Sequence, residues 1–231
     1  NLGSISSLDS VSINNNPLSF IIKNINTLNE EIILRFTITA SGNYKRIQYL
    51  SINVNKELLT VQNQNITVSL TSSGSIGYVA SNSLGEGLKY KTNSSQLYEG
   101  SFMIGNSENY IANQFRENPG PNLDFKTSEL ITYVSTVIPG RKTLGVYTDE
   151  NLSPNPKIEI RQANYFFDDS RVSDAIVFSY DIKNVTNTEL SNLYAGIIID
   201  WDLIDYTKNK VFNDNQRKMG VCYSSDSSLF A

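Results

Sequence analysis

The chain has 231 residues, of which 39% are hydrophobic and 18% are charged, and its formal net charge is −4. This length allows one large domain or two of ordinary size, each able to bury a core. The acidic balance and the lack of a basic run exclude the electrostatic footprint of a nucleic-acid-binding protein. No apolar run reaches the roughly eighteen residues that a membrane-spanning helix needs.

The composition favours strands joined by many turns. Roughly one residue in eight is Asn, well above ordinary usage, and Asn is poor in helix interiors but good in turns. Tyr, Phe, Ile and Val supply most of the apolar content, and these residues are enriched in strands. We therefore predict an all-β protein built from two β-sandwich modules.

The first module is expected over residues 1–73. The segment EIILRFTIT places large apolar residues at every second position from Ile32 to Ile38, as a strand with one buried face requires. Short strands at this spacing, separated by Asn, Ser and Gly turns, are typical of an immunoglobulin-like sandwich. The small, polar segment TSSGSIG (71–77) is the linker candidate, and the boundary between the modules is expected at 74–77. Further strands of this module are expected at 17–22, 47–54, 58–61 and 66–70.

A second, larger β-sandwich is expected over residues 78–231. Its most informative stretch runs from Asp174 to Leu203, where alternating apolar residues, a polar turn at 184–192 and an apolar return strand predict a β-hairpin. The chain stops soon after a strand, which predicts a module truncated at its C-terminal end. Other strands are expected at 97–104, 130–139, 158–167 and 220–223.

Two scarce residue types limit the chemistry. The chain has no His and a single cysteine, Cys222. A Ser-His-Asp or Cys-His triad cannot be assembled within it, and zinc sites that depend on these ligands are excluded. We therefore predict that the chain is not an enzyme and that any catalytic residues of the native polypeptide lie outside it.

Carboxylates near the end of the 194–201 strand form a candidate metal site. Asp200 and Asp202 are two residues apart and fall on one face of a strand, with Asp205 and Asp214 close behind. Clustered oxygen ligands are what Ca²⁺ prefers, so these four residues predict a calcium site. Two alternatives to a calcium site remain. The residues could form a solvated acidic loop, or Asp200 and Asp202 could act as the catalytic pair of a glycosidase.

Aromatic residues near the same loop predict a second kind of site. Trp201, Tyr206 and Tyr223 are candidates for stacking on sugar rings, which would make the region a carbohydrate-binding module. The alternative for Trp201 is a place in the core, since it follows an apolar strand.

Three segments together resemble a known family. They are YKTNSSQLYEGSFMIGNSENYIAN (90–113), IVFSYDIKNVTNTELSNLYAGIIIDWDL (176–203) and NDNQRKMGVCY (213–223). They resemble the non-catalytic C-terminal β-sandwich region of secreted bacterial subtilisin-like peptidases and related cell-surface proteins. The preceding module resembles adhesion-type immunoglobulin-like modules. The resemblance implies an extracellular or cell-surface location and a peptidase domain elsewhere in the polypeptide.

Together these observations predict a structural, adhesive or assembly region of an exported bacterial protein. Its expected partners are other domains of a longer polypeptide, or neighbouring copies bound through open strand edges. A carbohydrate-binding module of a secreted enzyme is the alternative, with a glycan as the partner.

Overall fold

The computed structural model describes residues 19, 21, 28–116, 120–136, 138–152 and 157–225. Within these ranges the chain forms fifteen β-strands, one turn of 3-10 helix and no α-helix, which confirms the predicted all-β fold. No helix of the described ranges is long and apolar enough to cross a membrane. The chain divides into two compact units, Asn1–Asn55 and Lys56–Ala231.

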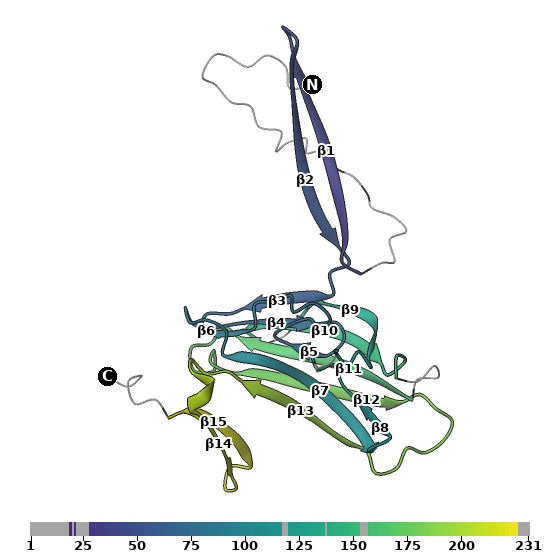
Figure 1. Cartoon of the computed structure of the whole chain (residues 1–231), viewed down its shortest axis with the longest axis vertical. Coiled ribbons are helices and arrows are strands. Elements are labelled where there is room, and N and C mark those ends of the chain that lie inside the picture. Colours follow the sequence, from purple (N-terminus) through teal and green to yellow (C-terminus); the bar gives the residue numbers. More distant parts are fainter. Residues whose placement is uncertain are drawn as a thin grey trace. The chain divides into compact units, whose positions relative to one another are not determined.

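The described part of the first unit is a long antiparallel hairpin of β1 (Glu30–Ala40) and β2 (Tyr44–Val54) (Figure 1). Its turn contains Gly42 and Asn43 at φ values of 77° and 63°, a left-handed conformation that these two residue types tolerate. The predicted alternation along β1 is confirmed as far as Phe36 by the burial pattern. The strand predicted at 17–22 lies outside the described residues.

The second unit is a β-sandwich. Its seven-stranded sheet has the order β13-β7-β5-β4-β3, with β6 beside β4 and β8 beside β7, and its four-stranded sheet has the order β12-β11-β10-β9. A hairpin of β14 (Asn209–Asp214) and β15 (Met219–Ser224) follows. The strands of the two sheets are β3 (Leu58–Gln62), β4 (Ile66–Thr71), β5 (Ser75–Ile76), β6 (Leu88–Tyr90), β7 (Leu97–Ser107), β8 (Tyr110–Ala112), β9 (Lys126–Val134), β10 (Gly140–Thr148), β11 (Ile158–Phe167), β12 (Ile176–Asn184) and β13 (Tyr194–Trp201).

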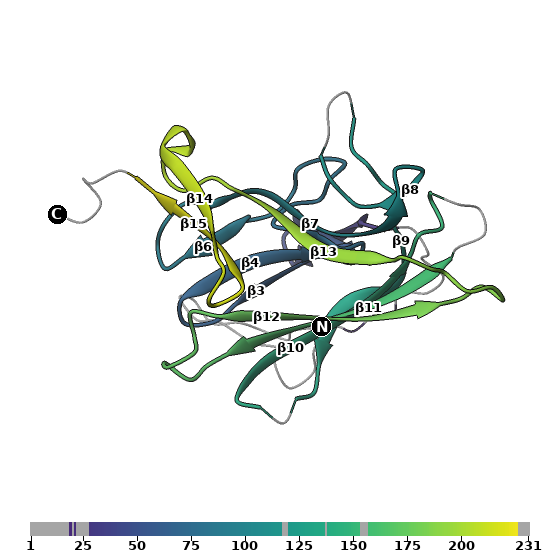
Figure 2. The same ribbon diagram turned by 90° about the horizontal axis from the view of Figure 1, so that it is seen from below.

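The core lies between the two sheets, which form separate layers in Figure 2. In one cluster, Leu70 and Leu97 of the larger sheet pack with Phe166 of the smaller one. In the other, the ring of Phe102 on β7 stacks on Tyr180 of β12, with 4.3 Å between ring centroids. Burying one large apolar side chain fully contributes about 1.5–3 kcal/mol to the free energy of folding. Contacts between such side chains across the two layers therefore hold the sheets together.

The predicted module boundaries need correction. The strands β3 and β4, assigned from sequence to a first module over 1–73, belong to the same sheet as β7 and β13. The segment predicted as a linker is buried throughout 71–77, and the Ser72 hydroxyl accepts a hydrogen bond of 2.9 Å from the Ile131 N–H. The units divide after Asn55, not at 74–77, so the larger unit begins well before residue 78.

The predicted hairpin over 174–203 is also different in the structure. Both strands form where predicted, but β12 pairs with β11 and β13 pairs with β7, in different sheets. The physical reason is that apolar residues of the polar connection, Leu190 and Leu193, pack against the core between the sheets. The connection therefore crosses from one layer to the other.

Candidate functional site

A recess of about 270 Å³ lies where the beginning of β7 meets the end of β13. It is lined by Tyr98, Asp200, Trp201, Asp202 and Tyr206, and we call it the aromatic–acidic recess. Four of these five side chains were predicted as site residues from sequence, two as metal ligands and two as sugar-stacking rings. The structure brings these four residues together in a single recess.

Tyr98 reaches the recess through a β-bulge. Asp200 pairs with Glu99, whereas the next residue, Trp201, pairs with Leu97, so β7 has one extra residue at Tyr98. Leu97 is 2% exposed in the core, while Tyr98 is 51% exposed. A bulge re-aims side chains at the end of a ladder, and this one presents Tyr98 beside the end of β13.

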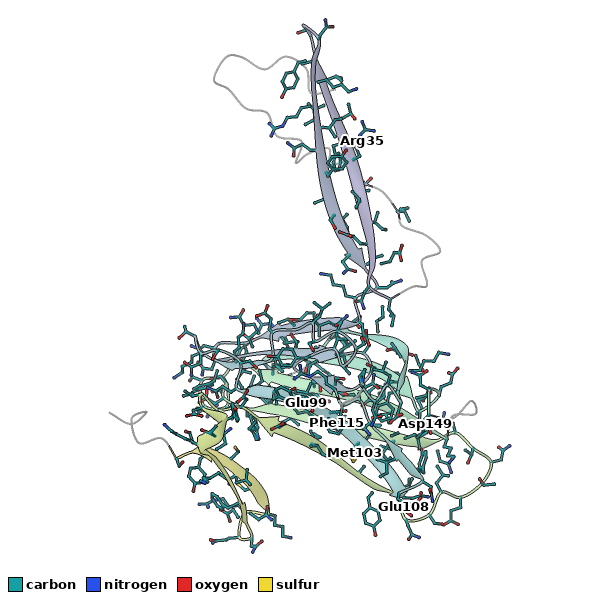
Figure 3. The ribbon with its side chains drawn as sticks, viewed as in Figure 1. Arg35, Glu99, Met103, Glu108, Phe115 and Asp149 are labelled. Atoms are coloured by element: carbon teal, nitrogen blue, oxygen red, sulfur yellow. The ribbon has the colours of Figure 1, made fainter. Side chains whose placement is uncertain are left out.

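Arg116 holds the Tyr98 side of the recess. Its guanidinium lies over the Tyr98 ring at 4.4 Å and over the Tyr78 ring at 4.8 Å from the centroids, and it also donates to the Tyr98 carbonyl. The Arg116 backbone N–H donates to the Glu99 carboxylate at 2.7 Å. Figure 3 labels Glu99 and Phe115, the sequence neighbours of Tyr98 and Arg116.

Backbone contacts fix the other side of the recess. The Asp202 N–H donates to the Gln96 carbonyl at 3.0 Å, and the Asn209 side-chain amide donates to the Trp201 carbonyl at 2.9 Å. The 3-10 turn η1 (Tyr206–Lys208) begins immediately after Asp205. Tyr206 stands 72% exposed at its start, so its ring is free to meet a ligand from solvent.

The two recess carboxylates differ from the other predicted acidic residues in their partners. Within the described part of the chain, the side chains of Asp200 and Asp202 have neither an ion pair nor a hydrogen bond. The recess therefore offers hydrogen-bond acceptors and aromatic faces.

The charge of Asp200 also acts on Cys222. Burial, and second the charge of Asp200, raise the pKa of the Cys222 thiol, which keeps that thiol protonated and unreactive.

Asp205 and Asp214 serve local turns rather than the recess. The Asp205 carboxylate accepts hydrogen bonds from the Thr207 hydroxyl and N–H at 2.6 and 3.1 Å, and these bonds lower its pKa. The Asp214 carboxylate accepts from the Arg217 N–H at 2.9 Å and pairs with its guanidinium at 2.6 Å, which again lowers the pKa. Neither lines the recess.

Tyr223 also lies elsewhere. It packs edge-on against Phe212 within the β14–β15 hairpin, at 6.1 Å between centroids. Among the described residues, no three His, Cys, Asp or Glu side chains gather closely enough to hold a metal ion. Calcium binding by Asp200 and Asp202 stays a prediction. Asp205 and Asp214, which were predicted as further ligands of the same ion, do not line the recess.

A second surface lies between β13 and the β14–β15 hairpin. β13 is at the edge of the seven-stranded sheet, and a groove of about 530 Å³ separates it from the hairpin. Val211 and Phe212 are 77% and 51% exposed. The apolar residues that line this groove are Ile197, Ile199, Trp201, Val211, Phe212, Val221 and Cys222.

Tyr98 is the recess residue that sequence reasoning missed. Its segment, LYEG, reads as an ordinary strand, and the extra residue that makes the bulge becomes visible only once the pairing with β13 is known. Comparison of the chain with protein-family models, with curated proteins and with solved structures gives no match. The relationship to subtilisin-associated regions therefore stays a prediction, and function is inferred from the recess and its surroundings.

Proposed function

We propose that the chain is a non-catalytic adhesive region of an exported bacterial protein, and that it recognises carbohydrate in the aromatic–acidic recess. The observation that carries the proposal is the convergence of Tyr98, Trp201 and Tyr206 on two carboxylates without partners. Its association with a subtilisin-like peptidase and its extracellular location rest on the sequence resemblance alone.

The chemistry of the lining suits a sugar. The apolar faces of sugar rings pack on aromatic side chains, which bring a large apolar surface and little side-chain entropy. The carboxylates of Asp200 and Asp202 can accept hydrogen bonds from sugar hydroxyls, and bonds to charged acceptors are the stronger kind. Tyr98 and Tyr206 are each more than half exposed, so the recess is accessible to one unit of a longer chain.

The single tryptophan of the chain makes this proposal directly measurable. Titration with oligosaccharides is expected to change the emission of Trp201 saturably. Tyr98→Ala is expected to weaken binding about tenfold, in line with about 1–1.5 kcal/mol for one aromatic contact. Trp201→Ala, followed by calorimetry, is expected to weaken binding by at least as much.

The matched control is Tyr194→Ala. Tyr194 lies on β13, the strand that carries Trp201, and is 77% exposed, but it does not line the recess. Equal weakening by this control and by Tyr98→Ala would contradict the assignment of the site. A titration in the presence of a chelator decides whether Ca²⁺ bridges Asp200 and Asp202 to the sugar. Product release from the bound oligosaccharide, lost in Asp200→Asn, would show the glycosidase alternative instead.

Assembly is the second candidate function, and the groove beside β13 favours it. An edge strand presents unpaired backbone groups, and exposed apolar surface of this kind marks interaction sites. The partner would be a neighbouring copy or another domain of a longer polypeptide.

Sedimentation velocity tests the first of these partners. The chain is expected to associate as its concentration rises, and Val211→Lys is expected to abolish this association by placing a charge in the groove. Val177→Lys is the control, because Val177 is also exposed but lies on β12 of the other sheet. A monomer at all concentrations would count against association between copies.

A further inference from the structure

We infer that the sugar bound in the aromatic–acidic recess carries a protonated amine, so that the recess selects amino sugars that lack an N-acetyl group. This inference rests on the carbohydrate proposal and adds the class of ligand. It follows from the balance of charge in the recess and from the kinds of group that line it.

The first step is the local surplus of negative charge. Asp200 pairs directly with Glu99 across the two strands, and like charges in opposite positions are unfavourable. Glu99 is compensated, because Arg116 donates its backbone N–H to the Glu99 carboxylate and brings its guanidinium within 3.9 Å. Asp200 and Asp202 have no such compensation among the described residues, so a cationic ligand would remove an unfavourable interaction.

The second step is the aromatic lining. Aromatic ring faces attract cations, and rings of Trp and Tyr do so best. The Tyr98 ring already has the Arg116 guanidinium 4.4 Å from its centroid, so the rings left for a ligand cation are those of Trp201 and Tyr206. A ligand ammonium in the recess would meet the rings of Trp201 and Tyr206 together with the two carboxylates.

The third step is what the lining lacks. None of the five lining side chains carries a positive charge, so the recess offers a sugar carboxylate or sulfate only the neutral Tyr and Trp donors, beside two carboxylates that repel it. An N-acetyl group removes the positive charge and leaves Asp200 and Asp202 uncompensated. The expected order of affinity is therefore free amino sugar, then neutral or N-acetylated sugar, then acidic sugar.

The experiment is a set of Trp201 fluorescence titrations of the full chain with fully de-N-acetylated and fully N-acetylated chito-oligosaccharides of equal length. The free amine is expected to bind about tenfold tighter, a difference of about 1.4 kcal/mol. This preference is expected to shrink at high ionic strength, because salt screens exposed charges. It is also expected to disappear above the pKa of the sugar amine.

Two conservative variants assign the preference to the carboxylates. Asp200→Asn and Asp202→Asn keep the shape of the recess and are each expected to reduce the preference severalfold, because affinity for the amino sugar falls further than affinity for the N-acetylated sugar. Asp181→Asn is the control, because Asp181 is an exposed carboxylate on β12 and its loss is expected to change neither affinity. Thermal unfolding of each variant confirms that it is folded.

The outcomes separate the two levels of the proposal. Equal, Tyr98-dependent binding of both sugars would overturn the amino-sugar inference and leave carbohydrate binding intact. Binding of neither sugar would overturn the carbohydrate proposal and the inference with it. Ethanolamine is the third ligand: if it binds as tightly as the amino sugar, the recess recognises an ammonium group alone, which overturns the sugar part of the assignment.

Discussion

Phe102→Ala is expected to lower the free energy of unfolding of the second unit by about 3–5 kcal/mol. Phe102 is 2% exposed and belongs to β7, which lies between β13 and β5 in the larger sheet. Its ring stacks on Tyr180 of the smaller sheet at 4.3 Å and lies 6.2 Å from that of Phe125. Truncation removes contacts that join the two layers and leaves a cavity that rigid strands cannot close.

Urea unfolding followed by the emission of Trp201 measures this loss in the unit that contains Phe102. Tyr194→Ala is the control, since Tyr194 lies on the neighbouring strand of the same sheet and is 77% exposed. Its effect is expected to stay within about 0.5 kcal/mol. A loss below about 1 kcal/mol for Phe102→Ala would mean that the aromatic stack across the layers is not what holds the sheets together.

The strands were predictable because their signal is local. Alternation in β12 placed Ile176, Phe178, Tyr180 and Ile182 on one face. The first three side chains do pack against the core, whereas Ile182 is 41% exposed. The predicted bounds of β11 and β13 agree with the structure. A period of two needs only a few residues of sequence, and burial of one face enforces it.

Strand partners were not predictable in the same way. Alternation states which residues face inward but not which strand lies alongside. A polar connection between two strands suits a hairpin and also a crossing between layers, and the apolar residues Leu190 and Leu193 that decide the matter here are few and irregularly spaced. The pairing of β12 with β11 and of β13 with β7 therefore emerged only from the structure.

The recess residues also differ in whether the sequence could predict them. Asp200, Trp201, Asp202 and Tyr206 lie within seven residues of one another in the sequence, so a single strand end brings them near each other and the sequence reveals the cluster. Tyr98 comes from a distant strand and depends on both the β7–β13 pairing and the bulge. Local pattern therefore predicts the contribution of one strand to a site, while the opposite wall depends on topology.

The misplaced linker has a different cause. Small polar residues make a chain flexible when it is exposed, but they also let the backbone approach closely in a core. In the segment 71–77 the second property operates, since Ser72 and Ser75 are 1% and 2% exposed. Their hydroxyls are satisfied by backbone partners, with Ser75 donating to the Gln114 carbonyl at 3.2 Å. Composition alone cannot distinguish these two uses of small residues.

Gly74→Ala turns that distinction into a measurement. Gly74 has a φ of +93°, and a Cβ there would lie 2.9 Å from both Cζ and Oη of Tyr147. Tyr147 is 1% exposed, and its hydroxyl donates to Gln162 at 3.0 Å, so its ring has little room to move. We expect the substitution to cost about 2–5 kcal/mol, combining about 1–2 for the left-handed backbone with about 1–3 for overpacking.

Urea unfolding monitored at Trp201 again supplies the measurement, with Gly196→Ala as the control. Nothing lies within 4 Å of the Cβ that Gly196 would gain, so this change on β13 is expected to be neutral or slightly stabilising. In a flexible linker, Gly74→Ala would also be neutral or would stabilise by restricting the unfolded chain. A destabilised Gly74→Ala beside an unaffected Gly196→Ala would establish the segment as core, because the substitution is the same and the packing around it differs.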